Sequence, residues 1–109
     1  DEISPYAKTN VIQLKNGEIS EIIIDPQLLN IKAEKFDNLV GDDASYNASK
    51  MIEIFKGKDN DFSKAVCLNA AAGLIVNEKY SEFLDAYNYS REFILSGKPY
   101  IHLEKIQNV

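Results

Sequence analysis

The chain has 109 residues, of which 45% are hydrophobic, enough for at most one domain with a core. Seventeen acidic residues outnumber twelve basic ones, and the net charge of −5 is a poor match for nucleic acid or an anionic membrane surface. A single cysteine, Cys67, excludes an internal disulfide and fits the reducing cytoplasm, and no apolar run reaches the roughly 18 residues that a membrane span needs.

The first predicted element is a β-hairpin. Residues 8–15 and 18–25 carry strand-forming apolar residues and flank Asn16-Gly17, a strong two-residue hairpin turn. The run Ile22-Ile23-Ile24 predicts a strand that is covered on both faces. Pro26 is expected to end this strand, because it has no N–H to donate to the ladder.

The signal for regular structure is weak between residues 26 and 43. A helical turn is expected to contain Leu28, Leu29 and Ile31. After it, an anchored loop is expected to contain Phe36, Leu39 and Val40. Asp42 and Asp43 resemble a metal-binding pair. Because they stand just before a helix, we expect them to cap it and to offset its dipole.

The rest of the chain is predicted to form three main helices. The first is expected to run from a Ser45 cap to Lys56, with Gly57 as a left-handed stop. Its apolar face follows the i, i+3, i+4, i+7 spacing at Ala48, Met51, Ile52 and Phe55.

The second predicted helix begins near Asp61 and continues through Val76. From residue 65 onward it is apolar nearly all round, which is typical of a helix buried on most sides. We therefore expect it to be the most buried element of the chain. The side chains expected to be largely inaccessible are Cys67, Ala70 and Leu74.

The third predicted helix begins at a Ser81 cap and ends at Gly97, with Pro99 just beyond. Its inner stripe is expected to consist of Phe83, Tyr87, Ser90 and Ile94. Beyond Pro99, Leu103 and Ile106 are expected to form only a short final helical turn.

Several polar residues are candidates for a functional role. Asn69 lies in the apolar part of the second helix, where an amide without partners costs about 1–3 kcal/mol. We expect it to tie this helix to a neighbouring backbone, the alternative being a ligand contact, and Asn47 follows the same logic at a more exposed position. His102 has no second histidine or cysteine nearby and is expected at the surface. Cys67 is expected to be a buried, inert thiol.

Short motifs are spread along the whole chain: Asp1-Glu2-Ile3-Ser4-Pro5, Asp25-Pro26, Gly41-Asp42, Asn47-Ala48, Leu68-Asn69-Ala70-Ala71-Ala72 and Ser96-Gly97-Lys98. Together they resemble the carboxyl-terminal part of the anthranilate phosphoribosyltransferases. One departure is Val40, which precedes Gly41 where the family often has a second glycine. Because the resemblance covers only the final part of the family's length, and the first residue is Asp1 rather than methionine, we expect a piece of a longer protein.

The resemblance implies an α/β fold in which residues 1–109 are the C-terminal portion of a catalytic domain. Within it we expect a hairpin in residues 1–25, a connecting region in 26–43 and a helical part in 44–109. The activity implied is the transfer of phosphoribosyl from phosphoribosyl pyrophosphate to anthranilate in tryptophan biosynthesis. Family members are commonly homodimers through an amino-terminal helical domain that is absent here.

The resemblance also assigns a role to Asp1 and Glu2. In the family such a pair helps to hold a magnesium ion (Mg²⁺) that bridges to the pyrophosphate of the sugar donor. Magnesium prefers one or two carboxylates together with water and phosphate oxygens, so the pair suits it. The alternative for Asp1 and Glu2 is a solvated, frayed terminus.

The chain lacks the rest of the family's catalytic machinery. Its glycines are isolated, so it has no glycine-rich loop to present backbone N–H groups to phosphates. We therefore expect the chain alone to be inactive. Two alternatives stay open: a stand-alone, non-catalytic interaction module, and a related phosphoribosyltransferase or nucleoside phosphorylase with another acceptor.

Overall fold

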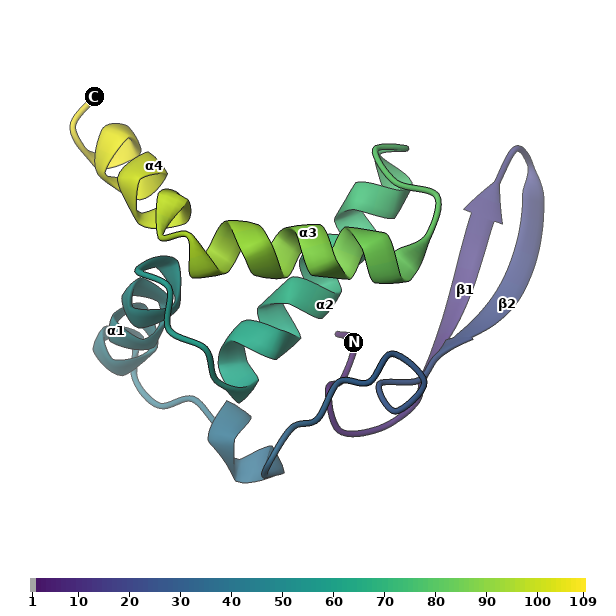
Figure 1. Ribbon diagram of the computed structural model, residues 1–109, viewed down its shortest axis with the longest axis horizontal. Helices are drawn as coiled ribbons and strands as arrows, with labels where there is room; N and C mark the ends of the chain where they lie inside the picture. The colour runs from purple at the N-terminus through teal and green to yellow at the C-terminus, as the bar shows by residue number, and fades with distance from the viewer. Residues whose placement is uncertain (1) are drawn as a thin grey trace.

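The computed structural model describes residues 2–109, which form a β-hairpin followed by four helices (Figure 1). The hairpin lies to one side of α2 and α3, and α1 and α4 lie to the other. The elements are β1 (Thr9–Lys15), β2 (Glu18–Ile24), the 3₁₀ helix η1 (Phe36–Leu39), α1 (Ala44–Phe55), α2 (Asp61–Val76), α3 (Phe83–Leu95) and α4 (Lys98–Gln107). The expected α/β class is therefore confirmed, but the described residues form four α-helices where three main helices were expected.

The hairpin forms as predicted. Its strands are antiparallel, with Lys15 opposite Glu18, and Asn16 and Gly17 turn the chain with φ values of 52° and 77°. The expectation that β2 is covered on both faces is wrong within this chain, because Ile23 is 62% exposed. Two strands alone leave one face without a covering layer, so the apolar side chains of β2 lie largely open.

Helix α1 begins at a cap that the sequence placed two residues too late. The Asp43 carboxylate accepts a hydrogen bond from the backbone N–H of Tyr46 at 2.8 Å, so Asp43 and not Ser45 is the cap. The capping role expected of Asp43 is thus confirmed. Gly57 ends the helical segment with φ 102°, as predicted. A Cβ atom there would lie 2.9 Å from the carbonyl oxygen of Leu95, so the close approach of α1 to the end of α3 also requires glycine.

The buried face of α1 matches the predicted stripe only in part, because Ile52 and Phe55 are half-buried and Phe55 packs against the core, whereas Ala48 is exposed. Ile54 is 2% exposed, whereas Met51 is 52% exposed. The periodicity was compatible with either face, and the contacts of α1 with α3 and α4 select the one that carries Ile54.

Helix α2 has the predicted bounds and supplies the centre of the core. Asn60 and Ser63 cap it reciprocally, and Cys67, Leu68 and Ala71 are fully inaccessible. The expected burial is confirmed for Cys67, but Ala70 is exposed and Leu74 is only half-buried. One face of α2 packs on α3, and the opposite face is partly open in this chain.

Helix α3 buries the predicted stripe, since Tyr87, Ser90 and Ile94 are inaccessible and Phe83 is half-buried. Its N-cap is Glu82 rather than the expected Ser81, without a side-chain capping hydrogen bond. Gly97 ends the helix as predicted, with φ 75°. Beyond it α4 is a full helix of ten residues rather than a short turn. Pro99 lies in the first turn of α4, where its missing N–H has no helical partner in any case.

The connecting region makes the predicted turn but not the predicted packing. The backbone N–H of Ile31 donates to the carbonyl oxygen of Pro26 at 2.8 Å, and Ile31 is buried. Phe36 and Val40, however, are 69% and 57% exposed, so the expected anchored loop is wrong at these two residues. Within residues 2–109 no helix is long and apolar enough to cross a bilayer.

The burial of α2 generates a prediction about Cys67. Burial raises the pKa of the Cys67 thiol to about 11, so at neutral pH the group is both inaccessible and protonated. We expect reaction with a disulfide reagent to be at least about 100-fold slower in the native chain than in denaturant. As a matched control, Val76→Cys in a Cys67→Ser background places a thiol at a position that is 83% exposed, and it should react quickly. Rapid native labelling of Cys67 would contradict this packing.

Candidate functional site

The carboxylate pair that the resemblance singles out stands at the start of the described chain. Asp1 lies outside the described residues. Glu2 is exposed, and the next residue, Ile3, is buried at 8% exposure. The segment Ile3 to Tyr6 runs beside α2, close to the middle of the molecule (Figure 1). Glu2 is therefore an exposed carboxylate directly before a residue that is already part of the core.

Asn69 of α2 holds the first residue of this segment. Its side-chain Oδ1 accepts from the backbone N–H of Ile3 at 2.9 Å, and its Nδ2 donates to the carbonyl oxygen of Ile3 at 3.1 Å. The same Nδ2 donates to the carbonyl oxygen of Ala65 at 2.9 Å. We call the two hydrogen bonds to Ile3 the Asn69 clamp. The expectation that Asn69 ties its helix to a neighbouring backbone is confirmed.

Asp61 holds the other end of the segment. The hydroxyl of Tyr6 donates to Asp61 Oδ2 at 2.8 Å. The same oxygen accepts from the backbone N–H of Glu34 at 2.8 Å and from Asn38 Nδ2 at 3.0 Å. Asp61 is 4% exposed and thus joins the N-terminal segment, the connecting region and α2. The sequence does not reveal this role, because an acidic residue in a first helical turn is sufficiently explained by the helix dipole.

The protonation of the Asp61 network follows from its contacts. Burial alone would raise the pKa of Asp61, but the hydrogen bonds from Asn38, Tyr6 and two backbone amides outweigh it and lower the pKa to about 2. Burial, together with the hydrogen bond to Asp61, raises the pKa of Tyr6 to about 12. At neutral pH the carboxylate is therefore charged and the phenol is protonated, as the donor and acceptor roles require.

The two attachment points lie on the same helix. Asp61 and Asn69 are eight residues apart, about 12 Å along an α-helix. Ile3 and Tyr6 are three residues apart and the chain bends at residues 5–7, so the Tyr6 side chain bridges part of this distance. Helix α2 therefore holds the start of the chain at two points.

Asn47 makes a second clamp of the same kind. Its Oδ1 accepts from the backbone N–H of Asp42 and its Nδ2 donates to the Asp42 carbonyl oxygen, both at 3.0 Å. A Cβ atom on Gly41 would lie 2.6 Å from Asn47 Oδ1, so the clamp requires glycine there. The structural role expected of Asn47 is confirmed, although it fastens a loop near the surface.

The other candidates have structural or surface roles. His102 is exposed on α4, as expected. Arg91, the only arginine, donates to both carboxylate oxygens of Asp59 at 2.8 and 2.9 Å. Both hydrogen bonds raise the pKa of Arg91 and occupy the guanidinium face that a phosphate would need. This pair was not anticipated, because its partners are 32 residues apart.

The carboxylates suit magnesium only as part of a larger site. Among residues 2–109 no three histidine, cysteine or acidic side chains converge on one point. An exposed Glu2 next to a second carboxylate is nevertheless the donor set that magnesium takes when water and phosphate oxygens complete its shell. The chemistry of the donor set thus fits the ion.

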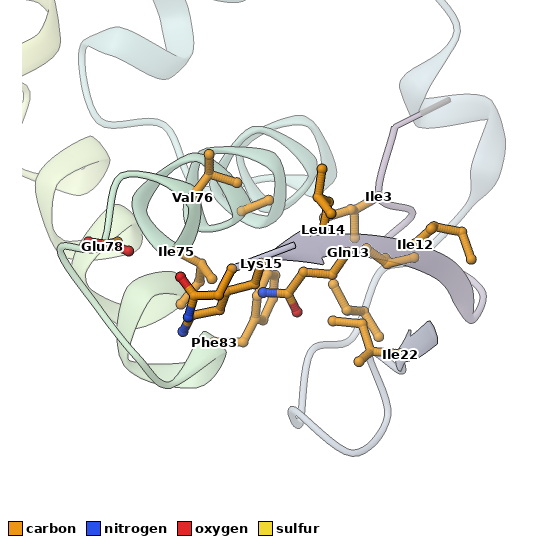
Figure 2. Close-up of a pocket in the computed structure, with 14 residues that line it drawn as sticks. Ile3, Ile12, Gln13, Leu14, Lys15, Ile22, Ile75, Val76, Glu78 and Phe83 are labelled. Atoms are coloured by element: carbon orange, nitrogen blue, oxygen red, sulfur yellow. The ribbon is translucent and has the colours of Figure 1, made fainter. Parts of the chain in front are cut away.

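A groove of about 350 Å³ separates β1 from the end of α2 and the start of α3 (Figure 2). Figure 2 shows Ile75 and Phe83 on its helical side and Ile12 and Ile22 on the hairpin side. Its lining is largely apolar, with Lys15 and Glu78 as its charged members. Such a lining resembles a core surface more than a site for a doubly charged sugar phosphate.

Comparison with known proteins places this arrangement in a family. Residues 1–100 match the glycosyl transferase family, a/b domain, and the chain belongs to that family. It is 72% identical over 109 residues to an anthranilate phosphoribosyltransferase of Pelagibacter ubique (strain HTCC1062), a match that covers 100% of this chain and 33% of that protein. It is 33% identical over 108 residues to the enzyme of the same name from Clostridium kluyveri (strain ATCC 8527), a match that covers 99% of this chain and 32% of that protein. The resemblance inferred from the motifs is therefore confirmed.

The fold agrees with a solved structure. Anthranilate phosphoribosyltransferase from Thermus thermophilus superposes with a TM-score of 0.81 at 24% identity, covering 91% of this chain and 30% of that chain. At this identity the match shows the fold alone. The chain thus spans about a third of the length of the curated relatives that it matches.

The Asp61 network generates a prediction about acid stability. The folded-state pKa of about 2 lies below the unfolded value of about 3.9, so the stabilisation is present above about pH 4 and is lost as the pH falls toward 2. We expect Asp61→Asn to lower the free energy of unfolding by about 2 kcal/mol at pH 7 and to flatten its decline below pH 4. Asp85→Asn, at an exposed position in α3, is the matched control. Equal acid profiles for wild type and Asp61→Asn in urea titrations would refute the assignment.

Proposed function

We propose that residues 1–109 are the C-terminal portion of the catalytic domain of an anthranilate phosphoribosyltransferase. The reaction is transfer of phosphoribosyl from phosphoribosyl pyrophosphate to the amino group of anthranilate, in tryptophan biosynthesis. The observation that carries this proposal is the 72% identity to the Pelagibacter ubique protein over the whole chain. Residues 1–25, 26–43 and 44–109 are then its hairpin, connecting region and helical part.

In this proposal Asp1 and Glu2 hold magnesium against the pyrophosphate of the donor. Magnesium, when bound there, neutralises charge that develops on the departing pyrophosphate. The contribution of this chain is to present the two carboxylates from a backbone that is fixed at Ile3. The exposure of Glu2 supports the role, because a carboxylate paired within the fold would have to be released first.

The remaining parts of the active site come from outside this chain. No glycine-rich phosphate loop is present in the sequence, and the only arginine is occupied by Asp59. The same division accounts for the apolar groove and the exposed face of β2, which we assign to contacts with the other two thirds of the polypeptide. We also propose that the complete enzyme is a cytoplasmic homodimer, joined through that other part.

A rival with a related fold is a phosphoribosyltransferase or nucleoside phosphorylase that uses a different acceptor. The residues that would choose the acceptor are outside this chain, so the identity to relatives of one name is the argument for anthranilate. A stand-alone interaction module is disfavoured by the largely exposed isoleucines of β2, which such a module would have to keep in water.

The first test replaces the matching third of the Pelagibacter ubique enzyme with this chain. We expect this chimera to consume anthranilate, followed by loss of its fluorescence, within about 10-fold of the parent rate. The 109-residue chain alone should show no turnover, because it lacks the groups that position donor and acceptor. A folded chimera without turnover would count against the proposed function, and turnover by the isolated chain would mean that the active site has been misplaced.

The second test addresses the carboxylates in the same chimera. Asp1→Ala with Glu2→Ala should raise the magnesium concentration needed for half-maximal rate by about 10-fold or more, because two of the ion's ligands are lost. The melting temperature should change little, since an exposed carboxylate contributes little to the core. The matched control is Glu18→Ala with Glu21→Ala, two exposed carboxylates on β2. An unchanged magnesium titration in the Asp1 and Glu2 variant would refute the proposal that these two carboxylates bind magnesium.

A further inference from the structure

We infer that Asn69 is a positioning residue for the Asp1-Glu2 carboxylates, acting through the Asn69 clamp on the backbone of Ile3. This inference rests on the proposed function, because it takes that pair as the magnesium-holding group. Within residues 2–109, Asn69 forms hydrogen bonds with Ile3 and Ala65 and not with the Glu2 carboxylate. Its part in the reaction is to fix the direction in which the backbone of Glu2 leaves the core.

The clamp acts on the peptide unit closest to the carboxylates. The N–H of Ile3 belongs to the peptide that joins Ile3 to Glu2, and Asn69 Oδ1 binds it at 2.9 Å. The carbonyl of Ile3 is held by Asn69 Nδ2 at 3.1 Å. With both polar groups of Ile3 bound by one planar amide and its side chain buried, the residue cannot rotate about the long axis of the segment.

The amide plane of Asn69 is itself fixed. Nδ2 carries two hydrogens, and the second is donated to the Ala65 carbonyl one helical turn earlier, at 2.9 Å. This third hydrogen bond decides which side of the amide faces the Ile3 N–H. The helix therefore presents an acceptor and a donor in the order that the Ile3 backbone requires.

Asparagine meets this requirement where similar residues do not. Aspartate keeps the acceptor but loses both hydrogen bonds donated by Nδ2, and alanine loses all three. A displacement of about 1 Å in a group that positions substrate can cost about 100-fold in rate. Loss of the clamp should therefore affect magnesium use more than it affects folding, which has the second attachment point at Asp61.

The experiment compares Asn69→Ala and Asn69→Asp with Asn47→Ala in the chimera. Asn47→Ala removes a clamp of the same geometry that fastens Asp42 instead of Ile3. Two quantities are measured: the magnesium concentration for half-maximal rate, and hydrogen exchange of the Ile3 amide. We expect Asn69→Ala to raise the magnesium concentration for half-maximal rate by about 10-fold and to speed exchange of the Ile3 amide by at least about 10-fold. Asn69→Asp should raise the magnesium concentration at least as much, because it loses both donated hydrogen bonds and adds a charge, and Asn47→Ala should change neither quantity.

The outcomes separate this inference from the proposed function. If Ile3 exchanges faster in the Asn69 variants while their magnesium titration stays at the wild-type value, the clamp is structural only and the positioning role is overturned. In that case the Asp1→Ala, Glu2→Ala variant still carries its magnesium defect, and the proposed function stands. If Asn69→Ala does not fold, Asn69→Asp decides: it keeps the side-chain volume but loses both donated hydrogen bonds and adds a charge, so an unchanged magnesium titration in that variant overturns the positioning role. A loss of rate equal in size for Asn47→Ala and Asn69→Ala would likewise overturn the role, since it would report general loosening.

Discussion

Two polar side chains of α2 fix the position of the segment from Ile3 to Tyr6. Asp61 binds the hydroxyl of Tyr6, and Asn69 binds the backbone of Ile3, so the segment from Ile3 to Tyr6 is held at two points of a helix that also forms the centre of the core. Each polar group is buried or half-buried, and each is satisfied by hydrogen bonds. Removing either partner would leave a buried donor or acceptor unpaired, at a cost of about 1–3 kcal/mol. The segment is therefore held by polar contacts as well as by the burial of Ile3 in the core.

The open apolar surface of the chain has a related explanation. Helix α2 is apolar nearly all round, yet only one of its faces is fully covered, and β2 exposes most of its isoleucines. A chain that spans about a third of its relatives' length cannot supply every layer around such elements. The apolar patterns of α2 and β2, which predicted burial on all or both faces, thus reflect their surroundings in the whole domain. The prediction of burial was wrong for this chain, because the sequence does not show which residues cover these faces.

Local signals predicted the hairpin and the bounds of α2, because turn chemistry and helix caps depend on residues adjacent in sequence. Features that depend on residues distant in sequence were not predicted. The buried face of α1 carries Ile54 because α3 and α4 lie on that side, and Asp61 gathers donors from residues 6, 34 and 38. Helix α4 was underestimated because Pro99 was interpreted as a stop, whereas proline in a first turn is equally suited to begin a helix.

The use of an amide rather than a charged group beside Ile3 has an electrostatic consequence. A carboxylate at position 69 would add negative charge next to two residues proposed to hold magnesium against a pyrophosphate, and it would compete for the ion or repel the donor. An ammonium group would draw the carboxylates toward itself. A neutral amide holds the backbone through a donor and an acceptor, adds no net charge and does not titrate. Position 69 thus adds no charge beside the carboxylates proposed to hold magnesium, while the backbone of Ile3 is held by the core.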